Sequence, residues 1–198
     1  MRISLILGHP NPGSFNHAIA AAAREQLLDG GHQVDFHDLY AEGFNPCLTP
    51  PELVPGSPIP ELLSGYCAEA ARADGLIVVH PNWWGQPPAM LKGWVDRVLR
   101  AGVAYKFGVN DKGEGVPIGL LRAKAALVFN TANTPVEREQ AIFGDPLEGL
   151  WKRCIFDFCG VKVVDRRVFS VVVTSTPGER ERWLAEVRSM VAVRFSQA

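Results

Sequence analysis

The chain has 198 residues, of which 47% are hydrophobic and 21% are charged, and its formal net charge is −1. This length favours one domain, covering residues 1–198, with enough apolar side chains to bury a core. A charge so close to zero provides no electrostatic surface for nucleic acid or for an anionic membrane. No apolar run approaches the roughly 20 residues of a spanning helix, so we expect neither a membrane span nor a nucleic-acid partner.

The cysteines and histidines indicate no metal site. The four cysteines show no CxxC spacing, and the five histidines are scattered without an HExxH motif, so neither set resembles a zinc site or a disulfide framework. We predict buried, reduced thiols and a cytoplasmic location. The first residues, MRISLILGHP, are predicted to form a strand rather than a signal peptide, because Gly8 and Pro10 end the apolar run. The cysteines are Cys47, Cys67, Cys154 and Cys159.

Apolar runs alternate with helix-period segments along the whole chain. The first half is predicted to contain a strand at 3–7, a helix at 15–28, a weaker strand at 34–36, a proline-rich loop at 41–60, a helix at 61–73 and a strand at 76–79. The second half is predicted to contain a helix at 88–100, a glycine-rich loop at 108–119, a strand at 125–129, a helix at 146–159 and a strand within 161–173. Ser14 is the expected cap of the first helix, and Thr176, Pro177 and Glu179 begin the last helix with a capping box.

The predicted strands are apolar throughout rather than alternating, which indicates strands buried on both faces. About five β–α repeats of this kind predict an α/β fold, a three-layer sandwich in which helices cover both faces of a five-stranded parallel sheet. Ligands bind such a sheet at the carboxyl ends of its strands. The loops that matter for function are therefore those after the first, third and fourth predicted strands, at 8–17, 80–88 and 130–136.

The first of these loops, GHPNPGSFNHA, leads directly into a helix. A helix amino terminus presents unpaired backbone N–H groups and a positive dipole end, which suit a phosphate group. The loop has neither a GK[ST] nor a GxGxxG motif. It predicts a phosphate site with His9 pointing toward the phosphate; the alternative is that Ser14 only caps its helix.

Two adjacent tryptophans follow the third-strand segment, in HPNWWGQPP. Trp83 and Trp84 stand where a ligand lies in this fold, and flat aromatic side chains suit a flat aromatic ligand. Pro81, Pro87 and Pro88 stiffen the loop. The alternative is that the two indoles pack beneath the loop or at a subunit contact.

Small polar side chains follow the next strand, in NTANTP. They can hydrogen-bond the polar edge of a ring, and a plain polar turn before a helix has the same composition. A phosphate site, an aromatic wall and a polar edge at neighbouring strand ends together fit one ligand, a flavin nucleotide. The sequence has no GxSxG motif to support a hydrolase.

At this point the sequence resembles the flavodoxin-like NAD(P)H:quinone oxidoreductase family (DT-diaphorase-like). The resemblance covers nearly the whole chain, and its most specific piece is PNWWGQPPAMLKGWVDRVLRAGVAYKF at 81–107. The stretches GHPNPGSFNHA, DLYAEGFNP, DKG and FCGV support it. It implies a flavin cofactor, with FAD favoured over FMN by the SFN stretch, NAD(P)H as co-substrate, and a homodimer with its active site at the subunit interface.

The resemblance also implies a set of site residues. The phosphate end of the flavin would be held by His9, Ser14, Phe15 and Asn16. Its ring would be bordered by Pro81, Asn82, Trp83, Trp84 and Gly85, and its polar edge by Asn130, Thr131, Ala132 and Asn133. The substrate would meet Phe143 and, from the neighbouring subunit, Tyr105 and Phe107.

The chain departs from the family pattern at several of these positions. Trp83 stands where relatives often have a glutamine, and Gly85 where they often have an aromatic residue. Asn-Thr-Ala-Asn replaces the common Thr-Thr-Gly-Gly. The diaphorase branch carries a Tyr and a His proposed to handle charge on the reduced flavin; here the His position is Phe143 and the Tyr position falls near Glu137. We therefore assign no catalytic acid or base.

These observations predict an enzyme that passes two electrons from NAD(P)H through a flavin to a quinone or a similar small aromatic acceptor. The alternatives are a regulatory subunit of the potassium-efflux type, a flavodoxin-like electron carrier and a flavin-free nucleotide-binding domain. Electron carriers of that type are usually strongly acidic, and a net charge of −1 provides no such docking surface.

Overall fold

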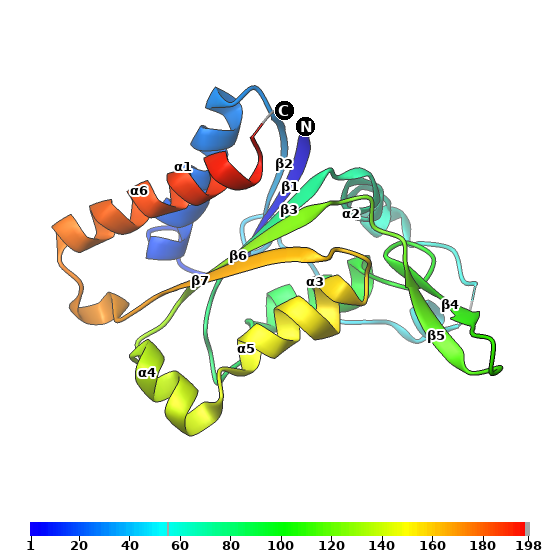
Figure 1. Ribbon diagram of the computed structural model, residues 1–198. Helices are drawn as coiled ribbons and strands as arrows, with labels where there is room; N and C mark the ends of the chain where they lie inside the picture. Colours follow the sequence, from blue (N-terminus) through cyan, green and yellow to red (C-terminus); the bar gives the residue numbers. More distant parts are fainter. Residues whose placement is uncertain (55, 197–198) are drawn as a thin grey trace.

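The computed structural model describes residues 1–54 and 56–196. Its centre is a five-stranded sheet in the order β2-β1-β3-β6-β7, in which every neighbouring pair is parallel (Figure 1). The strand order reverses between β1 and β3, and a sheet of this kind binds ligands at that switch point. The predicted five-stranded parallel sheet is confirmed. Its strands are β1 (Arg2–Leu7), β2 (Gln33–Asp38), β3 (Gly75–Pro81), β6 (Ala125–Thr131) and β7 (Val163–Phe169).

Helices cover both faces of the sheet, so the three-layer sandwich is also confirmed (Figure 1). On one face lie α1 (Phe15–Asp29) and α6 (Pro177–Arg194), which pack over a core containing Leu5, Ile77 and Leu127. The other face packs over a core containing Trp94 and Trp151. Its helices are α2 (Glu61–Arg72), α3 (Ala89–Val98) and α5 (Pro146–Gly149), which continues as the π-helix η3 (Leu150–Asp157).

Hydropathy explains the strands unequally. The central strands β1, β3 and β6 bury all or nearly all of their residues, as their unbroken apolar runs predict. The edge strands β2 and β7 are mostly half-buried, because each has a neighbouring strand on one side only. The middle of β7 is the charged triplet Asp165, Arg166 and Arg167, so the prediction of strands that are apolar throughout is wrong for the two edges.

The predicted helix starts are confirmed by their capping contacts. The side chain of Ser14 accepts a hydrogen bond from the backbone N–H of His17 at the start of α1. Thr176 and Glu179 form a reciprocal capping box at the start of α6, where Pro177 is the first helical residue. Short elements complete the connections: η1 (Pro50–Leu53), α4 (Val136–Arg138), η2 (Glu139–Phe143) and η4 (Val172–Thr174).

The glycine-rich segment at 108–119 is a hairpin and not a loop, which corrects the prediction. β4 (Tyr105–Val109) and β5 (Gly115–Gly119) pair antiparallel and project from the body of the molecule (Figure 1). Glycine and proline make these strands resemble a loop in sequence, yet the fold requires a glycine at position 119. A Cβ there would lie 2.2 Å from the backbone nitrogen of Gly160, so the hairpin is anchored by a close backbone contact.

The cysteines are all free thiols, and only two of them are buried. Burial raises the pKa of Cys159 to about 11 and also raises the pKa of Cys67. Cys47 and Cys154 are exposed, so the prediction of buried thiols is wrong for these two. Within the described ranges, no group of histidine, cysteine and acidic side chains could hold a metal ion, and no helix has the length and hydropathy to cross a membrane.

Candidate flavin-binding cleft

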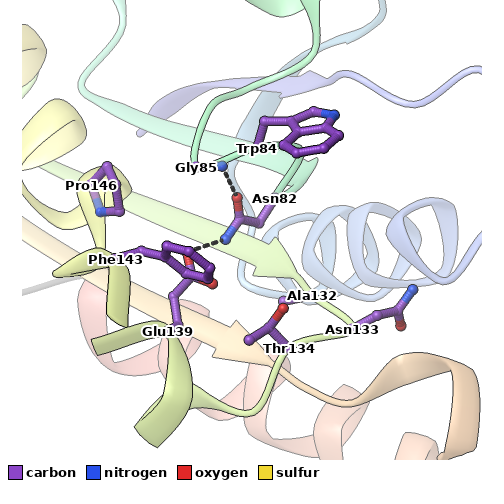
Figure 2. A pocket seen from close by; sticks show the side chains of 9 residues that line it. All are labelled: Asn82, Trp84, Gly85, Ala132, Asn133, Thr134, Glu139, Phe143 and Pro146. Carbon is purple, nitrogen blue, oxygen red and sulfur yellow. Dashed lines mark hydrogen bonds between the residues drawn. The ribbon is translucent and has the colours of Figure 1, made fainter. Parts of the chain in front are cut away.

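A cleft opens at the carboxyl ends of β3 and β6 (Figure 2). Its volume of about 470 Å³ lies in the range of small-molecule sites. Three segments form its walls: the turn after β3, the loop after β6 and the helical segment between 139 and 146. The lining residues are Asn82, Trp84, Gly85, Ala132, Asn133, Thr134, Glu139, Phe143 and Pro146.

Residues 82–86 form a tight turn, which we call the tryptophan turn. Trp83 and Gln86 exchange two backbone hydrogen bonds of 3.0 Å, and Trp84 and Gly85 at the tip have φ values of +57° and +70°. A left-handed conformation is uncommon for a residue with a side chain. It directs Trp84 outward, with its surface 100% exposed. Trp84 is one of the residues that line the cleft, and its indole takes no part in the core of the chain.

The first loop, residues 8–17, adjoins the tryptophan turn through two rings. The ring centroids of His9 and Trp83 lie 6.1 Å apart. Nδ1 of His9 lies 3.1 Å from Asn11 N and 3.3 Å from the Asn11 carbonyl oxygen. Burial and the neighbouring His17 lower the pKa of His9, although the contact with the Asn11 carbonyl and the charge of Asp38 act in the opposite direction. The structure thus places His9 next to Trp83, and the burial of the His9 ring favours its neutral form.

The amino terminus of α1 lies in the same loop. The Ser14 hydroxyl is 2.8 Å from His17 Nδ1, and His17 Nε2 is 3.0 Å from an oxygen of Asp38. The backbone N–H groups of Phe15 and Asn16 have no acceptor in the described part of the chain. Free N–H groups at a helix start suit an anion, which is consistent with the predicted phosphate site.

Two predicted residues of the first loop direct their side chains elsewhere. The ring of Phe15 packs between α1 and α6, with its centroid 5.7 Å from that of Trp183 and 6.4 Å from that of Phe169. Asn16 is buried and donates from Nδ2 to the Thr131 hydroxyl over 2.9 Å. Only the backbone of these two residues is free for a ligand, and the Asn16 contact fixes the first loop to the end of β6.

The loop after β6 contributes fewer side chains to the cleft than predicted. Asn130 is fully buried, and its amide is occupied by His80 Nε2 at 2.8 Å and by Arg166 Nε at 2.6 Å. Asn133 lines the cleft, although its Oδ1 accepts a hydrogen bond from Val173 N–H. Ala132, Asn133 and Thr134 therefore face the cleft, while Asn130 supports it from beneath.

A buried polar network lies beneath the cleft, and the sequence prediction missed it. Arg166, with a side chain only 2% exposed, forms an ion pair of 2.7 Å with Asp145. His80 accepts a hydrogen bond from Trp151 Nε1–H at Nε2 and contacts the Pro81 carbonyl through Nδ1. Burial lowers the pKa of His80 to about 3, so its ring is neutral. The signal in the sequence was the charged triplet inside an otherwise valine-rich strand.

Two cleft residues, Glu139 and Pro146, were also missed. Glu139 is only 9% exposed, and its Oε1 accepts a hydrogen bond of 3.0 Å from Asn82 Nδ2. Pro146 packs so closely on the tryptophan turn that a Cβ at Gly85 would lie 3.1 Å from its Cγ. No local pattern marks either residue, because both reach the cleft through contacts with a turn some 60 positions earlier in the chain.

The predicted substrate residues are separated within one chain. Phe143 lines the cleft and is 56% exposed. Tyr105 and Phe107 lie on the β4–β5 hairpin, far from α4 (Figure 1), where the Tyr105 ring packs against Phe158 with centroids 4.9 Å apart. These two can meet a cleft of this kind only if it belongs to another copy of the chain.

Comparisons with known proteins agree with this geometry. Residues 1–191 match the sequence model of a family described by its flavodoxin-like fold. The chain is 36% identical over 169 residues to an uncharacterized NAD(P)H oxidoreductase of Haemophilus influenzae, covering 83% of this chain and 81% of that protein. It is 30% identical over 203 residues to NAD(P)H dehydrogenase (quinone) 1 of Rattus norvegicus, covering 90% of this chain and 72% of that protein.

A solved structure shows the same likeness in three dimensions. The NAD(P)H:quinone oxidoreductase from Methanothermobacter marburgensis superposes with a TM-score of 0.82 at 26% identity, covering 100% of this chain and 99% of that one. The family match, the sequence identities and the superposition all extend over most of the chain. The protein therefore belongs to this family of flavodoxin-like fold.

Proposed function

We propose that this protein is a flavin-dependent NAD(P)H oxidoreductase that passes two electrons to a quinone or a similar small aromatic acceptor. The observation that carries the proposal is the cleft itself, which Trp84 and small polar residues line together. The first loop, with its free N–H groups, adjoins the tryptophan turn through the rings of His9 and Trp83. The names of the relatives from Haemophilus influenzae and Rattus norvegicus describe NAD(P)H oxidation, which supports it.

The groups around the cleft suit each part of a flavin nucleotide. A bound flavin supplies the hydride and electron transfer that amino-acid side chains do not perform. Trp84 would hold the ring by stacking, and the main chain at 132–134 would bond its polar edge. The N–H groups of Phe15 and Asn16 would hold a phosphate. The protein would thus bind and orient the flavin and shield it from water. NAD(P)H and the acceptor would occupy the same exposed face of the flavin ring in turn, which predicts ping-pong kinetics.

No cleft side chain is proposed as an obligatory acid or base. His80 is the nearest histidine in sequence to the tryptophan turn, and it is fully buried with a pKa of about 3. Both of its ring nitrogens are hydrogen-bonded inside the protein. His80 therefore serves the packing of the site and is not available to exchange protons with a substrate.

For the finer identity of the cofactor, we propose FAD rather than FMN. The Ser-Phe-Asn stretch after β1 supports this choice, because it resembles the FAD-binding branch of the family. We also propose a cytoplasmic enzyme, in keeping with its four free thiols. Mass spectrometry of the flavin released from purified protein distinguishes FAD from FMN directly.

We further propose a homodimer, supported by the apolar hairpin. Phe107 and Val109 lie on one face of β4 and are 65% and 73% exposed, while Ile118, which pairs with Lys106, is 41% exposed on the other face of the hairpin. Neighbouring exposed apolar side chains of this size are typical of an interface between chains. A second copy would bury them and would bring Tyr105 and Phe107 toward its own cleft. Light scattering of the native protein and of a Phe107→Ser variant tests this assembly.

The alternatives are less well supported. An electron carrier needs a charged docking surface, which the net charge of −1 does not provide. A regulatory subunit would bind the same flavin without turnover. Oxidation of NADH or NADPH with a soluble quinone separates an enzyme from both, and a colourless purified protein would leave only the flavin-free nucleotide-binding domain.

The decisive test replaces the exposed indole. Trp84→Ala should weaken flavin binding about tenfold or more, since stacking on an aromatic side chain contributes roughly 1–3 kcal/mol. Trp84→Phe, which keeps a flat ring, should weaken it less. Because the side chain is fully exposed, neither variant should lower the melting temperature. Full flavin content and turnover in Trp84→Ala would contradict the stacking role.

A further inference from the structure

Glu139 is a buried carboxylate whose position in the cleft is not explained by an ion pair. It is 9% exposed, and within the described residues it contacts no lysine, arginine or histidine within ion-pair distance. Its Oε1 instead accepts a hydrogen bond of 3.0 Å from Asn82 Nδ2 (Figure 2). Burying a carboxylate without a cation costs free energy, so an apolar residue would serve the packing of the fold better.

The contact with Asn82 fixes the orientation of that amide. A carboxylate has only acceptor atoms, so Asn82 must present its NH2 group to Glu139. Its oxygen is thereby directed to the other side, where it accepts a hydrogen bond of 2.9 Å from Gly85 N–H (Figure 2). With the amide reversed, an NH2 group would face the N–H of Gly85, and two donors would oppose each other.

The tryptophan turn needs such support, because two successive residues in it are left-handed. Trp84 has a φ of +57°, a conformation that is strained for a residue with a bulky side chain. The bond from Gly85 N–H to Asn82 closes the turn directly after Trp84. The direction of the indole therefore depends on Asn82, and the direction of the Asn82 amide depends on Glu139.

We infer that Glu139 is a positioning residue, which acts through Asn82 to hold Trp84 against the flavin. This inference rests on the proposed function for the role of Trp84, while the hydrogen-bonded arrangement itself does not depend on a flavin. Glu139 reaches the turn from η2, 57 positions further along the chain. It thus couples the helical wall of the cleft to the aromatic wall.

The test reverses the polarity of the Glu139–Asn82 hydrogen bond. Asn82→Asp places two carboxylates face to face and should weaken flavin binding about tenfold. Glu139→Gln still offers an acceptor oxygen and should change binding by about twofold or less. The double variant Asn82→Asp/Glu139→Gln restores one donor, one acceptor and the original charge, so its affinity should return to within about twofold of the native protein. All of these replacements are nearly isosteric.

Two readouts separate this inference from the proposed function. The first is the dissociation constant for FAD and for FMN, measured by fluorescence quenching. The second is amide exchange at Gly85 by NMR on the full chain without flavin, where Asn82→Asp and Glu139→Ala should lose protection and the double variant should regain it. Glu181→Gln makes the same charge change at an exposed position of α6 and should alter neither readout.

The outcomes are distinct. Recovery of both readouts in the double variant supports the inference. A double variant no better than Asn82→Asp alone, or Gly85 protection that survives Glu139→Ala, overturns it. Native protein that binds neither flavin overturns the proposed function instead, and the exchange data then still decide whether Glu139 holds the turn.

Discussion

The two ends of the proposed flavin site are built from different kinds of contact. In the first loop, hydrogen bonds from His9 to Ser14 join near neighbours in the sequence, such as His9 with Asn11 and Ser14 with His17, and the long-range contact is made further along, by Asn16 with Thr131. At the tryptophan turn, the contact between Asn82 and Glu139 spans 57 positions. The first kind forms once a helix has a cap, whereas the second requires the complete fold. Changes beneath the aromatic end should therefore disturb the whole protein, and changes between His9 and Ser14 in the first loop should remain local.

The largest effect is expected for Arg166→Ala. Arg166 is nearly fully buried and binds both Asp145 and Asn130, so its removal leaves a carboxylate and an amide without their partner. Breaking a buried pair in this way costs about 3 kcal/mol or more of unfolding free energy, which urea denaturation measures. The segment at 145–146 that carries Pro146 should loosen at the same time.

Arg167→Ala is the matched control, because it removes the same side chain from the next position of β7. Arg167 pairs with Glu186 near the surface, with the two side chains 36% and 39% exposed. A pair of that kind contributes about 1 kcal/mol or less. Equal losses of unfolding free energy in the two variants would show that the buried network beneath the cleft stabilises the fold no more than a surface ion pair does.

Acid should destabilise the protein through His80, which lies under the aromatic end. Its folded pKa of about 3 is below the ordinary 6.5, so the unfolded chain takes up a proton first as the pH falls. The stabilising effect is present above about 6.5 and is lost between there and about 3. Between pH 7 and pH 5 this contributes a loss of about 2 kcal/mol. The difference in pH dependence between native protein and His80→Gln measures it, and parallel curves would contradict the assignment.

The same contrast explains what could be predicted from the sequence. The sheet and the first loop depend on apolar runs and on a cap at Ser14, which are local patterns, and both were predicted. The position of Trp84 in the loop after β3 was also predicted, whereas the contact of Asn82 with Glu139 that supports its turn was not. Glu139, Pro146 and Arg166 act on partners distant in the chain, and their role exists only once β3, β6 and β7 lie side by side. The hairpin at 105–119 was missed for the related reason that Gly119 packs against a distant backbone.

A pair of glycines sharpens the comparison. The backbone of Gly85 has a φ of +70°, and a Cβ added there would lie 3.1 Å from Cγ of Pro146. A Cβ added to Gly13 in the first loop would contact only Oδ1 of Asn11, at 3.7 Å. Gly85→Ala should therefore cost about 1.5 kcal/mol, and Gly13→Ala should be close to neutral. Thermal unfolding of the two variants checks this, and a larger loss at Gly13 would reverse the proposed difference between the two ends.

A loss of about 1 kcal/mol of unfolding free energy, as for other lost helix caps, is expected for Ser14→Ala. Thr176→Ala removes the equivalent cap from α6 and should cost about the same. Ser14 also lies beside the free N–H groups of α1, so only its replacement should weaken flavin binding, by a few fold. If both variants bind flavin equally well by fluorescence quenching, Ser14 only caps its helix, and the phosphate is held by the backbone alone.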